Sequence, residues 1–126
     1  ERVPILYARE EFSQQSSSSL QWKLQTFLEL QSCNADKISN VIVVGDSNDE
    51  MGAARMLALW WPTVLVKQVK LLSKPSLIEL KQEVKLLRSE LQRLAGSSES
   101  ETLAIAPEAE AHGASKSVSP ATRRAR

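Results

Sequence analysis

Hydrophobic residues switch between strand-type runs and helix-type spacing along the first half of the chain. The apolar run at residues 3–7 predicts a first strand, and the polar stretch after it, with serines at 16–19, predicts a loop. From residue 20 to about residue 34 apolar positions recur every three or four residues, which predicts an amphipathic helix capped by those serines. Residues 41–44 form an uninterrupted β-branched run, the pattern of a strand buried on both faces of a parallel sheet.

The second half continues the alternation. Ser47 opens a helix that should run to about residue 59 and end before Pro62. Residues 64–72 place lysines between valines, which predicts a more exposed strand, and Pro75 opens a last helix. Strands that alternate with helices through short connections indicate an α/β fold, a partial Rossmann-like parallel sheet with flanking helices.

The last helix carries a single apolar stripe among many charged residues. We interpret this stripe as the face that packs on the sheet. It spans under three heptads and also fits pairing with a second helix, so a noncatalytic interaction module with a helix-mediated protein partner remains an alternative. The stripe consists of Leu77, Leu80, Val84, Leu87, Leu91 and Leu94.

The composition changes after Gly96. Residues 97–126 are rich in Ser, Ala, Glu and Pro and contain few large apolar side chains, so they should not bury enough surface to offset chain entropy. The sequence therefore predicts an α/β domain over residues 1–96 and a disordered, low-complexity tail over residues 97–126.

Composition limits the classes of partner and chemistry. With 16 basic and 15 acidic residues the net charge is +1, which favours neither a nucleic acid nor a membrane surface. No apolar run approaches the roughly 20 residues that span a bilayer. The single cysteine, Cys33, excludes an internal disulfide and favours an intracellular, cytoplasmic location. The sole histidine, His112, lies in the tail, which argues against a catalytic triad or a zinc site.

The most informative segment for chemistry is the acidic loop after the second predicted strand. Gly45 permits a sharp exit from that strand, and Asp46, Asp49 and Glu50 offer carboxylate oxygens of the kind that bind magnesium. Open α/β sheets place ligands at this end of their strands. Ser47 and Glu50 also have the spacing of a helix capping box, and this second interpretation is compatible with the first.

The acidic loop resembles motif IV of haloacid-dehalogenase-like (HAD-like) phosphatases, in which Gly-Asp-x-x-x-Asp follows an apolar strand; here Glu50 takes the last acidic place. The resemblance implies that Asp46 is the main magnesium ligand, with Asp49 or Glu50 as its companion. It also implies a catalytic role for Lys23, which is placed like the motif III lysine that neutralises charge around the phosphate. An ordinary solvated helix lysine is the alternative for Lys23.

Two departures from the family pattern bear on activity. The family's first strand ends in an Asp-x-Asp pair whose aspartate attacks phosphorus, and residues 1–33 contain no aspartate. Tyr7 stands where the second motif has a small serine or threonine, although it also fits a simple strand-end aromatic. The chain begins with Glu1 rather than methionine, so either the numbering begins inside a longer protein or processing removed the start, and a missing N-terminal piece has to be considered. We therefore interpret it as a C-terminal fragment or a pseudoenzyme, inactive alone and able to take a phosphorylated substrate only with an upstream segment.

Overall fold

The computed structural model describes residues 2–105. Its elements are α1 (Ala8–Phe12), α2 (Ser19–Asn34), β1 (Asn40–Gly45), α3 (Asn48–Trp60), β2 (Leu65–Lys70), α4 (Leu77–Gly96) and β3 (Thr102–Ala104). The three strands form one parallel sheet in the order β1, β2, β3. The predicted α/β class with a parallel sheet and flanking helices is confirmed.

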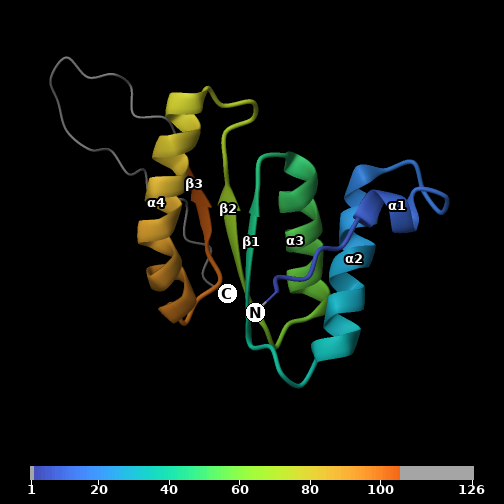
Figure 1. Ribbon diagram of the computed structural model, residues 1–126. Coiled ribbons are helices and arrows are strands. Elements are labelled where there is room, and N and C mark those ends of the chain that lie inside the picture. Colours follow the sequence, from blue (N-terminus) through green and yellow to red (C-terminus); the bar gives the residue numbers. More distant parts are fainter. Residues whose placement is uncertain (1, 106–126) are drawn as a thin grey trace, which may run out of the picture.

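The sheet lies between two helical layers (Figure 1). On one face α3 packs on β1 and β2, and α2 packs on α3 and adds Phe27 and Leu28 to the same core. On the other face α4 contributes Leu94, which packs with Val69 of β2 and Ile105. This three-layer arrangement leaves β1 at one edge of the sheet, and no strand among residues 2–105 pairs with its outer side.

The N-terminal segment differs from the sequence prediction. Residues 3–7 form no strand, and α1 occupies part of the stretch predicted as a loop. Pro4 cannot donate a backbone hydrogen bond, which makes this segment a poor partner for a sheet edge. The short α1 is held by the buried ring of Phe12 and by the Arg9 guanidinium, which lies 6.0 Å from the centre of the Trp22 ring on α2.

The strand predicted to be more exposed, β2, is the central and most buried one. Val66 and Val69 are buried on opposite faces, and Lys67 is 0% exposed. The Lys67 ammonium donates to the backbone carbonyl of Ser97 (2.7 Å), just beyond the C-terminal end of α4, where a helix carries partial negative charge. A buried lysine is tolerated here because that carbonyl accepts a hydrogen bond from its ammonium group.

The predicted tail boundary is wrong. Residues 102–104 form β3, which pairs in parallel with β2, and Ile105 is buried beside Leu94. The Arg93 guanidinium on α4 and the Glu101 carboxylate form an ion pair (3.0 Å) that fixes the return of the chain. The structured part therefore extends at least to residue 105, and the rest of the predicted tail lies outside the described residues.

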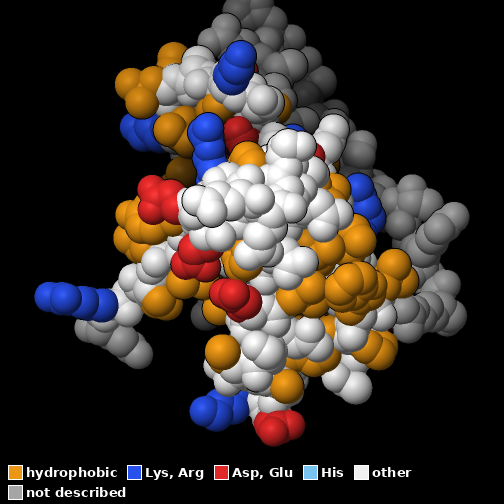
Figure 2. Space-filling model, turned by 90° about the vertical axis from the view of Figure 1, so that its right-hand side faces the viewer, with side chains coloured by type: hydrophobic (Ala, Val, Ile, Leu, Met, Phe, Trp, Pro, Cys, Tyr) orange, Lys and Arg blue, Asp and Glu red, His pale blue; other side chains and the backbone are white. Residues whose placement is uncertain are grey.

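Within residues 2–105 no helix combines the length and the hydrophobicity needed to cross a membrane. The side of the molecule formed by α1 and α2 carries both signs of charge, with hydrophobic side chains gathered in one area (Figure 2). Neither sign of charge dominates this side, in keeping with the net charge of +1.

Candidate functional site

The acidic loop lies at the C-terminal end of β1, where the strand leads into α3. Gly45 pairs in register with Lys70 of β2. The Lys70 ammonium donates to the backbone carbonyl of Asp46 and to that of Leu71 (3.0 Å), so the central strand fixes the start of the loop. Sequence reasoning gave Lys70 no role, because its position depends on the pairing of two strands that are distant in sequence.

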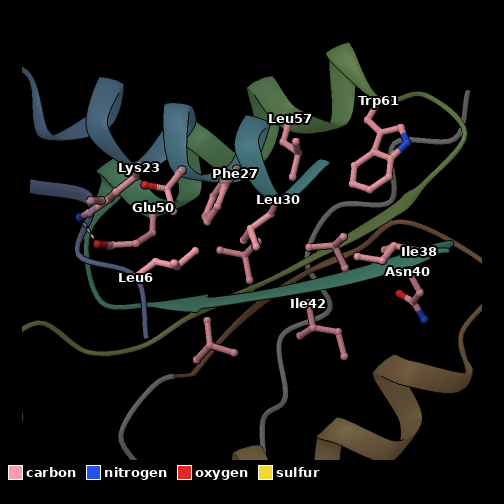
Figure 3. A pocket seen from close by; sticks show the side chains of 15 residues that line it. Leu6, Lys23, Phe27, Leu30, Ile38, Asn40, Ile42, Glu50, Leu57 and Trp61 are labelled. Atoms are coloured by element: carbon pink, nitrogen blue, oxygen red, sulfur yellow. Dashed lines mark hydrogen bonds and ion pairs between the residues drawn. The ribbon is translucent and has the colours of Figure 1, made fainter. Parts of the chain in front are cut away.

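The structure brings Lys23 of α2 to the acidic loop, as Figure 3 shows. Its ammonium forms an ion pair with the Glu50 carboxylate and lies 3.5 Å from the Ser47 hydroxyl. The sequence suggested Lys23 only by its placement on a helix. The structure shows that Lys23 contacts the loop. Its catalytic role stays a prediction.

Glu50 also closes the capping box that the sequence predicted. The backbone N–H of Ser47 donates to Glu50 Oε2 (2.8 Å), and the Ser47 hydroxyl donates to the same oxygen. Burial by itself raises the pKa of the Glu50 carboxyl, but the hydrogen bonds from Lys23 and Ser47 and the charge of Lys23 outweigh it. The pKa of Glu50 therefore lies below its usual value of 4.5.

The other two acidic residues of the loop have different surroundings. Asp49 accepts a hydrogen bond from the Ser19 hydroxyl at the start of α2. The Asp46 side chain is exposed and has no partner in the described part of the chain. Two of the three carboxylates predicted as metal ligands are thus engaged in internal contacts, and only Asp46 is left open.

The three carboxylates do not form a ready-made metal site. Among residues 2–105 no group of three or more His, Cys, Asp or Glu side chains is arranged to hold a metal ion. Asp46 alone fits a magnesium ion that keeps several water ligands, whereas a closed site would need oxygen atoms from elsewhere.

A groove of about 580 Å³ runs along the outer edge of β1, which has no strand partner in the described part of the chain, and reaches the acidic loop (Figure 3). Phe27 and Leu30 of α2 line it on one face of the strand, and Ile42 lies on the other face. Leu6 of the N-terminal segment and Trp61 also contribute to its walls. The Tyr7 side chain is exposed and is not part of the lining. The groove is therefore a mostly apolar space beside the outer edge of β1, the edge that does not pair with β2.

Gly45 is required by the close approach of Glu50. A β-carbon at residue 45 would lie 2.7 Å from both Cβ and Cγ of Glu50, too close for either atom to remain in place. We expect Gly45→Ala to lower the free energy of unfolding by about 1–3 kcal/mol, as in other overpacked positions. Urea unfolding measures the change.

Gly96→Ala is the matched control, because a β-carbon there meets nothing within 4 Å. Alanine at this helix end should leave stability unchanged or raise it by up to about 1 kcal/mol. Equal losses in the two variants would show that Glu50 does not constrain residue 45.

The ion pair between Lys23 and Glu50 predicts a pH dependence. Because the folded pKa of Glu50 is lowered, its contribution to stability is present above the unfolded pKa of about 4.5 and is lost as the pH falls through the folded pKa. Lys23→Met should lower the free energy of unfolding by about 1–2 kcal/mol at neutral pH and reduce the further loss on acidification.

Unfolding curves from pH 7 to pH 3 test this, with Lys37→Met as the control. Lys37 is exposed and forms no ion pair in the described part of the chain. An acid-induced loss of the same size in Lys23→Met and in the unsubstituted protein would mean that the pair does not form in solution.

Comparisons of the chain with protein-family models, with curated proteins and with solved structures find no match.

Proposed function

We propose that the chain is the C-terminal part of a HAD-like phosphatase-type domain that carries the magnesium-binding loop and takes its aspartate nucleophile from a strand outside this sequence. The observation that supports the proposal most directly is that the outer edge of β1 pairs with no strand among residues 2–105. This edge ends at the acidic loop and borders an apolar groove. A strand that paired with β1 there would place its own C-terminal end beside Asp46, because parallel strands end at the same edge of a sheet.

The residues of the chain have limited roles in this proposal. Asp46 would hold the magnesium ion, which when bound offsets the negative charge of a phosphoryl group. Lys70 fixes the backbone of Asp46, and Lys23 keeps Glu50 ionised and oriented beside the loop. Without the additional strand no residue supplies the nucleophile, so the chain alone should be inactive, as a pseudoenzyme would be.

The test extends the chain at its N-terminus by the segment encoded immediately upstream. We expect magnesium-dependent hydrolysis of a small phosphate ester by the extended protein, none by the present chain, and loss of activity in the extended Asp46→Asn variant. Asp36→Asn is the control, because Asp36 is exposed and lies outside the loop. Hydrolysis that survives Asp46→Asn, or an upstream segment without an Asp-x-Asp pair, would refute the proposal.

A second function is favoured by the exposure of the α4 stripe. The sequence favoured packing of this stripe on the sheet, but only Leu87 and Leu94 join the core. Leu77 is 83% exposed and Val84 is 58% exposed, and Leu80 and Leu91 are also exposed. We propose that this exposed face binds a helix of a protein partner, with or without catalysis elsewhere in the molecule.

For location we propose an intracellular, cytoplasmic protein that binds neither nucleic acid nor membranes. The exposed free thiol of Cys33 and the balanced charge support this proposal.

A further inference from the structure

The exposed stripe of α4 contains a hollow with the residue spacing of a helix-pairing surface. Leu77, Leu80, Lys81 and Val84 line a hollow of about 380 Å³. Their spacing of i, i+3, i+4 and i+7 is that of the four residues that receive one side chain from a facing helix in coiled-coil packing. The same spacing recurs one heptad later at Val84, Leu87, Arg88 and Leu91, where Leu87 is partly buried against the core and the other three are exposed.

Charge is segregated around this stripe. At 3.6 residues per turn, Lys81, Lys85 and Arg88 lie beside the stripe on the side that faces away from the sheet, which we call its outer flank. The glutamates of α4 lie on the opposite side of the stripe, toward the sheet. All three cations are exposed, and none forms an ion pair within residues 2–105. Each of the two four-residue sets thus combines three apolar side chains with one unpaired cation.

A second copy of α4 would not supply free negative charge opposite the cations of this flank. The Glu79 carboxylate accepts from the N–H of Ser76 (2.7 Å) in the helix cap. Glu83 is buried and accepts from the N–H of Leu72, and Glu90 is paired with Arg93 (2.6 Å). No glutamate of α4 is therefore free to meet Lys81 or Arg88 of a neighbouring copy.

From these contacts we infer that the exposed face of α4 binds an amphipathic helix of another protein. The apolar residues of that helix follow heptad spacing, and the side chains beside them are acidic. This inference rests on the helix-binding function proposed above and specifies the chemistry of its partner. Carboxylates seven residues apart on the partner would face Lys81 and Arg88, while its apolar side chains enter the two four-residue sets.

The test uses the full chain and two designed helical peptides of about three heptads with identical leucine positions. One carries glutamate on its flanks and the other carries lysine. We expect fluorescence anisotropy at low salt to show that the glutamate peptide binds at least about tenfold more tightly than the lysine peptide. Added salt should reduce this ratio of affinities. Val84→Asp should abolish binding of the glutamate peptide while leaving the circular dichroism spectrum unchanged.

A pair of charge variants tests the flank. Lys81→Gln with Arg88→Gln should remove the preference for the glutamate peptide. Gln82→Glu with Ser89→Glu makes the same change in net charge at exposed positions away from this flank and should retain it. Equal binding of both peptides to the unsubstituted chain would refute the acidic partner while leaving helix binding intact.

Other outcomes would refute the inference in favour of a different occupant. Failure to bind either peptide would refute helix binding itself. Binding to phosphatidylserine vesicles without peptide binding would assign the face to a membrane surface. A dimer in sedimentation velocity that Val84→Asp dissociates would assign it to a second copy of the chain.

Discussion

Replacing Leu94 by aspartate should lower the free energy of unfolding by about 4 kcal/mol or more, which is a large fraction of the stability of a small domain. Leu94 is 0% exposed and packs against Val69 and Ile105 between α4 and the sheet. The substitution removes this contact and introduces a carboxylate with no buried partner. Urea unfolding followed by circular dichroism measures the loss.

Val84→Asp is the control on the same helix. Because Val84 is 58% exposed, its replacement should change the free energy of unfolding by no more than about 0.5 kcal/mol. Leu87→Asp should fall between the two, since Leu87 is only partly buried. Similar losses at residues 84 and 94 would mean that the N-terminal half of α4 packs in solution as its C-terminal half does.

A chain that ends at Ser97 should be less stable than a chain that ends at Ile105 by about 3–4 kcal/mol, as expected when one large buried side chain and its partners are lost. The shorter chain lacks β3 and Ile105, so the buried strand β2 becomes an edge strand with unpaired backbone groups. Thermal melts of the two proteins at equal concentration test the difference.

Ile105→Ala in the longer chain provides a graded comparison. It should lower stability by about 2–3 kcal/mol, less than the removal of the whole segment, because β3 remains in place. Equal melting temperatures of the two truncated chains would restore the interpretation of residues 97–105 as part of a disordered tail.

The outer edge of β1 could also affect the measured unfolding midpoints. The groove lies along the outer edge of the apolar strand β1, which pairs with no strand among residues 2–105. Unpaired edges promote association between chains, so the unfolding experiments should be repeated at several protein concentrations. A midpoint independent of concentration would indicate that the groove stays open without driving association.

Local sequence signals predicted the elements whose formation depends on nearby residues. The β-branched run of β1 and the Ser47–Glu50 capping box that opens α3 both match the structure. Ser18 caps α2, as the serines before it predicted, by accepting the backbone N–H of Gln21. The last helix was predicted to open at Pro75, but its cap is Ser76, which accepts the backbone N–H of Glu79. Caps and apolar periodicity act within a few residues of one another, so a single sequence is enough to identify them.

In the candidate site, too, local sequence predicted one part and the tertiary structure supplied the other. The acidic loop is contiguous in sequence and was predicted as a unit, including Asp46, Asp49 and Glu50. The contacts that orient it come from other elements: Lys23 and Ser19 from α2 and Lys70 from β2. These contacts join residues more than 20 positions apart, and no local pattern specifies them.

By itself the sequence determined the α/β class, the apolar character of β1 and the position of the acidic loop. Only the tertiary structure decided that β2 is central, because strand order depends on which chain segment returns to pair with it. The return of residues 102–104 buries Lys67 against the end of α4. Tertiary structure also decided which residues of the α4 stripe are buried. Leu87 and Leu94 pack against the sheet, whereas Leu77 and Val84, which belong to the same stripe, are exposed to solvent. Periodicity fixes which residues share a helix face, whereas burial depends on what lies opposite that face.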